Sequence, residues 1–474
     1  MRFKICTFVN PKQSAKIPKM RVHFIAIGGS AMHNLAIALH NKGYQVTGSD
    51  DEIFEPALTR LNKCGLLPEK IGWDSENITP DLDAVILGMH AKNDNPELIK
   101  ARQSGVKIFS YPEYLYEQSK DKIRIVIGGS HGKTTITAMI LHVMKDLGIE
   151  TDYMVGAQLE GFDVMVKLSH DAKYMVFEGD EYLTSAIDRR PKFHLYQPHI
   201  GLISGIAWDH INVFPTFENY KEQFRIFAGM IPDDGTLIYC ADDENVTEIA
   251  DQLRTSKTFA FKPYNLPQFT IKQGISYIHQ LNNEIPMKVF GKHNMLNLEG
   301  AKCVLESIGV QPEDFYKSIS TFKGASKRLE LIASAPTINV YKDFAHSPSK
   351  LKATIEAVKT QFPERKLIAC MELHTYSSLS TEFLKQYAGC MNNADIAIVY
   401  YNKHALELKK LPFFNKELVI EAFGRSDISV FTNAGEMTGY LEKIVDGNSN
   451  LLMMSSGDFD GLNLKQFGAE IAKQ

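Results

Sequence analysis

The segment from Ile123 to Thr135 constrains the fold of this chain more than any other, because a β-branched run passes into a glycine-rich turn, a lysine and two threonines. The apolar run predicts a buried strand, and the residues after the turn predict a helix that begins near Thr134. Glycine permits positive φ angles and close backbone approach, so the N–H groups from Gly129 to Lys133 are expected to surround a phosphate. The segment therefore predicts a phosphate-binding loop.

The polar residues of this loop have expected tasks. Lys133 is expected to neutralise the β- and γ-phosphates of a nucleotide, and Thr134 is expected to ligate Mg²⁺. The positive end of the helix dipole adds to the attraction for phosphate. The spacing departs from the common G-x-x-x-x-G-K-[ST] pattern, because Ile127 stands where the first glycine belongs. A glycine-rich turn that simply precedes a helix therefore stays open as an alternative.

Length and composition limit the remaining choices. The chain has 474 residues, which at roughly 150 residues per domain predicts about three domains. Its net charge of −4 offers no general attraction for nucleic acid or an anionic membrane, so neither partner is expected. The six cysteines form no C-x-x-C pair, and no apolar run is long enough to span a membrane. We therefore expect a cytoplasmic protein with reduced thiols.

The first part of the chain has the pattern of a nucleotide-binding Rossmann-type half. A strand is expected from Val22 into a glycine turn, then a helix up to Gly43 and a second strand that ends at Asp50. Further strands are expected at Ala84–Leu87 and Val106–Phe109, with a helix from near Asn95 between them. Whether Met1 to Val9 adds an edge strand stays open. Ala26 and Ala31 replace two glycines of G-x-G-x-x-G, which disfavours an NAD-dependent dehydrogenase.

Two strands of the middle part are predicted to bring polar residues to the phosphate loop. The expected strands Tyr174–Glu178 and Ile200–Ser204 are followed by the carboxylates of Glu178, Asp180 and Glu181 and by Asp209-His210. Ligands bind beyond the carboxyl ends of parallel strands, so these clusters should converge on the phosphate. One of the three carboxylates is expected to hold Mg²⁺. His210 is a candidate metal or phosphate contact, and Asp188 to Arg190 is either an anion contact or a salt-bridged turn.

The last part of the chain supplies further candidates. Asn294 and Asn297 lie three residues apart, a spacing that places two amides on one helix face for an adenine edge or a water network. A boundary is expected at Gly324, after which Lys327-Arg328 offers a cation for the transferring phosphate. Asp343 and His346 follow a predicted strand and are candidates for a ribose contact and a hydrogen-bonding imidazole. The strands expected after the boundary are Ile338–Asp343, Lys366–Cys370, Ile396–Tyr400 and Asn450–Met454.

Together these motifs resemble, in order, those of the Mur ligases, which are ATP-dependent enzymes that form amide bonds in bacterial peptidoglycan synthesis. The motifs that carry the resemblance are Gly129–Thr135, Glu178–Glu181, Asp209-His210, Gly291–Asn294 with Asn297, Lys327-Arg328 and Asp343–His346. The resemblance implies an α/β fold of three domains. These are a Rossmann-like UDP-sugar domain over residues 1–120, a central P-loop ATPase domain with a mostly parallel sheet over 121–324, and a Rossmann-like C-terminal domain over 325–474.

The resemblance also implies roles for individual residues. Lys133, Glu178, His210 and Arg328 would be catalytic, and Mg²⁺ would be held by Thr134, Glu178 and His210. ATP would be bound by Gly129, Ser130, His131, Gly132, Lys133, Thr134, Thr135, Asn294, Asn297, Arg328 and Asp343. The UDP-sugar would be bound by Gly28, Gly29, Ser30, Met32, Ser49, Asp50 and His90, and the acceptor by His346 and His374.

The identity of the acceptor depends on finer details of the resemblance. Ile27–Ser30 and Gly48–Asp50 resemble the branch that uses UDP-N-acetylmuramate itself and attaches either L-alanine or the murein tripeptide L-alanyl-γ-D-glutamyl-meso-diaminopimelate. Segments similar to the tripeptide-using members, which act in peptidoglycan recycling, are Gly88–Glu97, Gly179–Tyr182, Asp188–Phe193 and Ser456–Gly461. Thr375 stands where an arginine is expected in the alanine-using members. The resemblance therefore favours the tripeptide, with L-alanine as the enzymatic alternative and a nucleotide-gated binding protein as the non-enzymatic one.

Overall fold

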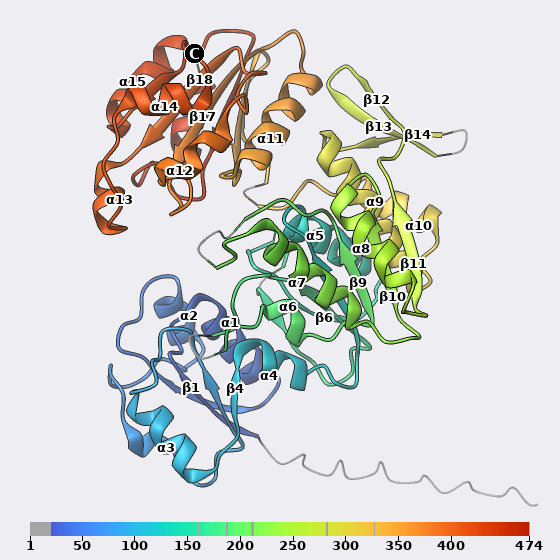
Figure 1. Ribbon diagram of the computed structural model, residues 1–474, viewed down its shortest axis with the longest axis vertical. Coiled ribbons are helices and arrows are strands. Elements are labelled where there is room, and N and C mark those ends of the chain that lie inside the picture. The colour runs from blue at the N-terminus through green and yellow to red at the C-terminus, as the bar shows by residue number, and fades with distance from the viewer. Residues whose placement is uncertain are drawn as a thin grey trace, which may run out of the picture. The chain divides into compact units, whose positions relative to one another are not determined.

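The computed structural model describes residues 20–159, 161–162, 164–185, 188–209, 213–280, 283–326 and 328–473. The chain divides into two units. The first contains the chain up to Tyr111 together with Ser185, and the second contains Pro112–Thr184 and the chain from Asp188 onward. Many elements of both units are labelled in Figure 1.

The first unit is built on a parallel four-stranded sheet with the order β2-β1-β3-β4. Its strands are β1 (Arg21–Ile25), β2 (Gln45–Ser49), β3 (Ala84–Leu87) and β4 (Ile108–Ser110). Its helices are α1 (Ser30–Asn41), α2 (Ala57–Lys63), α3 (Pro96–Ser104) and the 3₁₀ helix η1 (Ser75–Asn77). The Asn95 side chain caps α3 by accepting from the N–H groups of Glu97 and Leu98, which explains the predicted helix start.

A seven-stranded sheet forms the first part of the second unit, with the order β11-β10-β9-β5-β8-β6-β7. All neighbours are parallel except β6 and β7. The strands are β5 (Ile123–Gly128), β6 (Thr151–Met154), β7 (Val166–Lys167), β8 (Tyr174–Glu178), β9 (Ile200–Ile203), β10 (Thr236–Cys240) and β11 (Ala260–Tyr264). The helices are α4 (Tyr111–Glu117), α5 (Lys133–Asp146), α6 (Lys192–Leu195), α7 (Phe217–Gly229), α8 (Glu244–Arg254), α9 (Lys292–Ser307) and α10 (Pro312–Ile319).

Helices α5 and α9 pack side by side, and both bury apolar residues in the same core as the sheet. An antiparallel meander precedes α9 and was not predicted. Its strands are β12 (Phe269–Lys272), β13 (Ile275–Gln280) and β14 (Asn283–Met287). The meander is hydrogen-bonded to the side chain of Gln361. This amide donates to the Gly274 carbonyl at 2.7 Å and accepts from the Ser276 hydroxyl at 3.0 Å.

A six-stranded sheet forms the last part of the second unit, with the order β15-β16-β20-β17-β18-β19. Only the β15–β16 pair is antiparallel among its described neighbours. The strands are β15 (Glu330–Ser334), β16 (Ile338–Asp343), β17 (Lys366–Leu373), β18 (Ile396–Tyr401), β19 (Ser429–Phe431) and β20 (Ser449–Met454). The helices are α11 (Pro348–Gln361), α12 (Thr381–Leu384), η2 (Lys385–Tyr387), α13 (Lys403–Leu408), α14 (Lys416–Phe423), α15 (Ala434–Ile444) and α16 (Leu464–Ile471).

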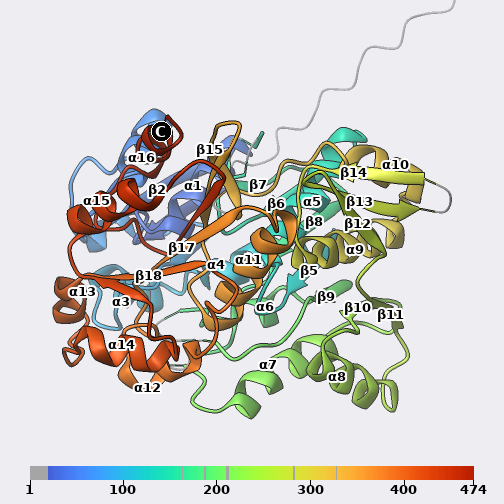
Figure 2. The same cartoon turned by 90° about the horizontal axis from the view of Figure 1, so that it is seen from above.

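Helices cover both faces of this sheet (Figure 2). Alternate residues of β17 enter two different cores, since Leu367 and Ala369 pack with α11, α12 and α14, whereas Ile368 and Cys370 pack with α15 and α16. A strand buried on both faces reads as a continuous apolar run, which is the pattern that predicted it. The predicted α/β class with mostly parallel sheets is confirmed.

The structure also bears on the expectations about thiols, membranes and the first strand. The described cysteines, Cys64, Cys240, Cys303, Cys370 and Cys390, form no disulfide, and Cys6 lies outside the described residues. None of the helices in the described ranges has both the length and the apolar character needed to cross a bilayer. The first described strand begins at Arg21, and Met1 to Val9 lie outside the described residues.

Candidate active site

The predicted phosphate loop lies between β5 and α5. Gly132 is the N-cap of α5 with φ +77°, and Gly129 has φ +131°. A Cβ atom at Gly129 would lie 2.1 Å from the Ser204 hydroxyl oxygen, and one at Gly132 would lie 2.2 Å from Oδ1 of Asn297. Backbone conformation and lack of space therefore both require glycine at these positions. The helix begins at Lys133, one residue before the predicted start.

The Lys133 ammonium is held at the mouth of the loop by a carboxylate. Its Nζ donates to Oε2 of Glu181 at 2.7 Å and to the Gly129 carbonyl at 2.7 Å. Burial alone would lower the pKa of Lys133, but the charges of Glu181 and Asp180 outweigh it and raise this pKa. Tyr220 supports the pair, because its hydroxyl donates to Oε1 of Glu181 at 3.0 Å and lies 2.9 Å from Ser130 Oγ.

The three carboxylates that follow β8 have different partners. Glu178 accepts from the Thr134 hydroxyl at 2.7 Å and from the Gly156 N–H at 2.8 Å. Asp180 instead pairs with Lys192 at 2.6 Å, and although burial opposes it, the charges of Lys192 and Lys133 lower the pKa of Asp180 to about 2. With Glu181 paired to Lys133, Glu178 is the one of the three that faces Thr134. Two hard oxygen donors therefore meet at this point, a donor set suited to Mg²⁺.

One pocket in the second unit collects most of the predicted nucleotide residues. The predicted residues that line it are Ser130, His131, Gly132, Lys133, Thr134, Thr135, Glu178, Asn294, Asn297, Arg328 and Asp343. The pocket is also lined by His293 and Lys350, which were not among the predicted site residues. His210 and Lys327 lie outside the described residues. The carboxyl ends of β5, β8 and β16 thus contribute to a single cavity.

The two asparagines lie on one face of α9, as their spacing predicted, and both are buried. Gly291 occupies the N-cap, so neither asparagine caps the helix. The Asn294 amide donates to the Phe290 carbonyl at 2.9 Å, and the Asn297 amide lies 3.5 Å from Oδ1 of Asn294. The pair therefore lines the pocket with amide groups directly beside Gly132.

Arg328 and Asp343 reach the pocket from the last part of the chain. The Arg328 guanidinium lies 4.9 Å from the centre of the Phe344 ring, and its Nη2 is 3.5 Å from the Thr134 hydroxyl. Asp343 accepts from the N–H groups of Leu329 at 2.5 Å and Ala345 at 2.7 Å. Burial raises the pKa of Asp343 although Arg328 and these N–H groups lower it.

Histidines near the pocket are held neutral. Burial, together with the Lys350 charge, lowers the pKa of His131 to about 3 and that of His346 to about 4. His131 Nε2 lies 2.8 Å from the Ser349 hydroxyl, and His346 Nδ1 lies 2.8 Å from the Phe344 carbonyl. His374 is not among the residues that line this pocket and follows the end of β17.

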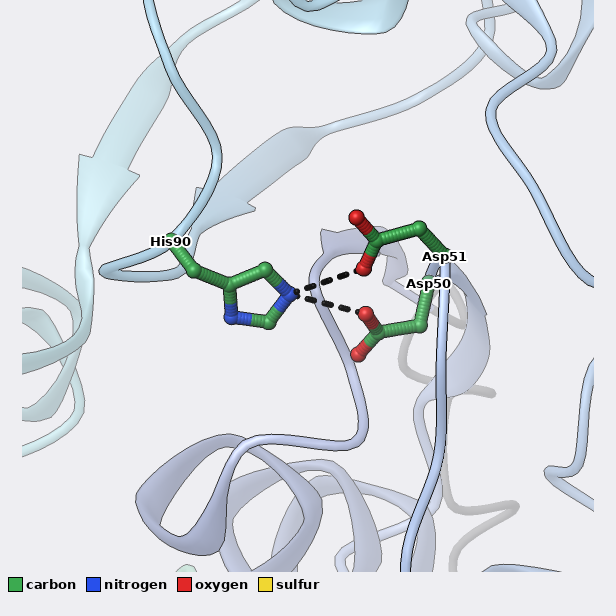
Figure 3. A group of neighbouring side chains, drawn as sticks. All are labelled: Asp50, Asp51 and His90. Atoms are coloured by element: carbon green, nitrogen blue, oxygen red, sulfur yellow. Dashed lines mark hydrogen bonds and ion pairs between the residues drawn. The ribbon is translucent and has the colours of Figure 1, made fainter. Parts of the chain in front are cut away.

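The predicted UDP-sugar residues lie in the first unit. The N–H of Gly28 donates to Oδ2 of the buried Asp50 at 2.6 Å, and His90 Nε2 is 2.8 Å from Oδ1 of Asp50. Figure 3 shows His90 pointing at Asp50 and Asp51, and their three nearest ligand atoms lie within 4.8 Å of one another. The carboxyl ends of β1, β2 and β3 therefore bring these residues together.

The remaining UDP-sugar candidates have other surroundings. Gly29 and Ser30 lie at the surface where α1 begins, whereas Met32 is buried in α1. The Ser49 hydroxyl donates to Oε2 of the fully buried Glu97, which also lies 3.5 Å from His23 Nε2. This hydroxyl therefore belongs to an internal network.

Tyr220 and Lys350 contact the site but were not predicted from the sequence. Tyr220 is fully buried, and nothing in its local sequence distinguishes it from a core aromatic residue on α7. Lys350 lies in the first turn of α11, and its Nζ is 3.4 Å from Oδ2 of Asp209. Its position seven residues after Asp343, at the end of a parallel strand, is a signal that would have indicated it.

We expect Tyr220→Phe to lower the free energy of unfolding by about 1–3 kcal/mol, because buried oxygens of Glu181 and Ser130 lose a partner. Urea unfolding of both proteins measures the difference. The matched control is Tyr400→Phe, since the buried Tyr400 hydroxyl has no hydrogen-bond partner among the described residues. That control is expected to cost less than about 0.5 kcal/mol. Equal losses in the two variants would contradict the role assigned to Tyr220.

Comparison with known proteins places this geometry in a family. Three family models match successive parts of the chain. They are described as Mur ligase family, catalytic domain (residues 21–122), Mur ligase middle domain (127–305) and Mur ligase, glutamate ligase domain (327–457). The first two models meet near the end of α4, and the last begins beside Arg328.

Relatives and solved structures agree with these matches. The UDP-N-acetylmuramate–L-alanine ligase of Carboxydothermus hydrogenoformans is 30% identical over 96% of this chain and 97% of its own length. The enzyme of the same name from Sulfurihydrogenibium is 31% identical over 94% of this chain and 96% of its own length.

Two crystal structures share the three-domain fold at 22% identity. The UDP-N-acetylmuramate–alanine ligase of Thermotoga maritima has a TM-score of 0.68 and covers 94% of this chain and 98% of its own. The murein peptide ligase of Psychrobacter arcticus has a TM-score of 0.63 and covers 96% and 99%. The chain therefore belongs to the Mur ligase family of ATP-dependent ligases.

Proposed function

We propose that this protein joins L-alanine to the lactyl carboxylate of UDP-N-acetylmuramate at the expense of ATP. The main support for this proposal is that one pocket contains Lys133, Thr134 and Glu178 together with residues of α9 and β16. A pocket that combines a phosphate loop, amides and an arginine suits phosphoryl transfer better than nucleotide binding alone. The choice of L-alanine is supported by relatives of that name, which align along nearly the whole chain.

The proposed reaction has two stages. ATP first phosphorylates the lactyl carboxylate, and the amine of the acceptor then attacks the acyl phosphate to give an amide, ADP and phosphate. Lys133 and the backbone N–H groups of the loop stabilise negative charge on the transferring phosphoryl group. Arg328 adds a second cation beside Thr134, where its guanidinium lies over the Phe344 ring.

The oxygen donors of Thr134 and Glu178 fit a magnesium ion, and His210 is the third proposed ligand. The ion would neutralise phosphate charge when bound.

The remaining proposed assignments follow the sequence predictions. ATP is bound by the loop, Asn294, Asn297, Arg328 and Asp343, and the UDP-sugar by Gly28 to Ser30, Asp50 and His90. The predicted Met32 and Ser49 are buried, so we do not propose their side chains as direct contacts. His346 and His374 serve the acceptor. We propose domain boundaries after residues 120 and 324, and a cytoplasmic location, where ATP and UDP-sugars are made.

A second candidate acceptor is the tripeptide L-alanyl-γ-D-glutamyl-meso-diaminopimelate, which the sequence motifs favoured. Thr375 supports this candidate, since it stands where an arginine is expected in alanine-using enzymes. In the structure, the Thr375 hydroxyl accepts from the Ser378 N–H at 3.1 Å and so shapes the turn after β17. A threonine side chain carries no charge, so position 375 offers no cation to the carboxylate of free L-alanine.

The acceptor assignment is tested by ADP release from purified protein given ATP, Mg²⁺ and UDP-N-acetylmuramate. We expect kcat/KM for L-alanine to exceed that for the tripeptide by at least about tenfold, a difference of about 1.4 kcal/mol. A control without UDP-N-acetylmuramate measures background hydrolysis of ATP. A preference for the tripeptide would overturn the alanine assignment and establish the second candidate, whereas no ADP release with either acceptor would contradict the ligase proposal itself.

A further inference from the structure

We propose that His374 is the base that takes a proton from the acceptor amine, and that the buried Glu372 is the residue that positions it. The proposal rests on the proposed function, because it concerns the second stage of that reaction. It holds for either acceptor, since both L-alanine and the tripeptide present an ammonium group that must lose a proton before it attacks.

The two residues form a dyad at the carboxyl end of β17. His374 Nδ1 lies 3.5 Å from Oε1 of Glu372, and the side chains are 41% and 3% exposed, respectively. The histidine thus reaches solvent while the carboxylate behind it does not. A carboxylate at Nδ1 favours the tautomer that carries its proton there, which leaves Nε2 as the acceptor on the exposed side.

The surrounding turn is built around this dyad. The other oxygen of Glu372, Oε2, accepts from the Ser455 hydroxyl and from the Phe459 N–H at 2.9 Å. A Cβ atom at Gly457 would lie 2.6 Å from His374 Nδ1, so the imidazole needs a glycine beside it. The residues after β20 therefore leave space for the ring and fix the carboxylate that orients it.

The dyad lies at the same edge of the sheet as one wall of the nucleotide pocket. In the sheet, β20 lies between β16 and β17, and Met454 is in register with both Asp343 and Met371. Adjacent strands lie about 4.8 Å apart, so Asp343 and Met371 are separated by roughly 10 Å, and His374 follows three residues after Met371. All three strands present their carboxyl ends at this edge. An acceptor bound at His374 would therefore lie at the same edge of the sheet as the pocket where the acyl phosphate forms.

Charge explains why a buried glutamate would be retained here. An unpaired carboxylate is costly to bury, and the hydrogen bonds from Ser455 and Phe459 compensate only one of its oxygens. When His374 takes up a proton, the second oxygen gains a cation, so the pair is better satisfied during the reaction than before it. This difference between the two states is what a positioning residue contributes to a base.

The acceptor ammonium gives one proton to Nε2 of His374, and the freed lone pair of nitrogen forms a bond to the acyl carbon. The bond between that carbon and the phosphate oxygen breaks, and the phosphate leaves with the electron pair. The second proton on nitrogen goes to the departing phosphate, and His374 later returns its proton to water.

Hydroxylamine separates this role from a structural one, because it is largely unprotonated at neutral pH and attacks acyl phosphates without a base. We expect His374→Asn to lower turnover with the preferred acceptor by about 100-fold, with hydroxamate formation from ATP, UDP-N-acetylmuramate and hydroxylamine unchanged within about threefold. Glu372→Gln should lower turnover with the acceptor by about tenfold and also spare hydroxamate formation.

The matched control is His404→Asn, since His404 also pairs with a carboxylate, Glu407 at 3.2 Å, but on the exposed helix α13. Both activities should be unchanged in this variant. Equal losses with both nucleophiles in His374→Asn, or no loss with either, would overturn the assignment of the base. Absence of ATP-dependent hydroxamate from the parent protein would instead contradict the proposed function, so the two failures are distinguishable.

Discussion

Replacing Lys133 with alanine should lower the rate of ADP release by about 10³-fold or more, while the affinity for the UDP-sugar changes little. The ammonium of Lys133 is the cation placed at the mouth of the phosphate loop, where Glu181 and the Gly129 carbonyl hold it. A preorganised cation or donor directed at developing phosphate charge contributes on the order of 10²–10⁵ in rate. The predicted UDP-sugar residues belong to the first unit, so calorimetric titration with UDP-N-acetylmuramate should give a similar Kd for both proteins.

Lys145→Ala is the matched control, because Lys145 lies on the same helix α5, about 18 Å further along its axis. That side chain donates to the Gly161 carbonyl and does not line the nucleotide pocket. Its removal should leave turnover within about twofold. The assignment of Lys133 would be wrong if its alanine variant, shown by thermal unfolding to be folded, kept more than a tenth of the parent activity.

The second large effect is expected for Gly132→Ala. An alanine at φ +77° costs roughly 1–2 kcal/mol, and its Cβ would meet Oδ1 of Asn297 at 2.2 Å, so the loop or α9 must shift. Because the N–H groups of the loop and the Asn297 amide share this pocket, kcat/KM for ATP should fall by about 100-fold, or about 3 kcal/mol. Steady-state kinetics at varied ATP measures this loss.

Gly148→Ala isolates the backbone contribution to that effect. Gly148 lies just beyond the other end of α5 with φ +67°, and an added Cβ there would have no atom within 4 Å. This variant should therefore lose roughly 1 kcal/mol of stability in urea unfolding while it keeps its kcat/KM for ATP. If Gly148→Ala and Gly132→Ala reduced activity to the same extent, the loss could not be attributed to the pocket.

Several parts of this fold were predictable from residue patterns alone. The strands predicted at Ala84–Leu87, Tyr174–Glu178 and Ile338–Asp343 coincide with β3, β8 and β16, because each contains the β-branched, aromatic or other apolar residues that a buried strand needs. The turn chemistry around Asn95-Pro96 and Gly132-Lys133 likewise placed the starts of α3 and α5. Local patterns of this kind depend only on neighbours in the sequence.

Other features depend on contacts between distant residues. The strands of the β12–β14 meander are partly exposed, so they lack the apolar residues that marked the central strands. The cluster Glu178, Asp180 and Glu181 contains three adjacent carboxylates, and only the positions of Thr134 and Lys192 decide which one faces the loop. Glu372 carried a signal that was overlooked, since it is a charged residue inside the otherwise apolar strand β17.

Helix α11 connects two places that are far apart on the molecule. Its first turns place Lys350, Ala353 and Thr354 on the nucleotide pocket, and its last residue, Gln361, is bonded to the β12–β13 turn. A helix of this length is about 21 Å long and nearly rigid. A movement of one end of this helix would therefore also move the meander, and a fluorophore attached at the exposed Ile275 would report such a movement.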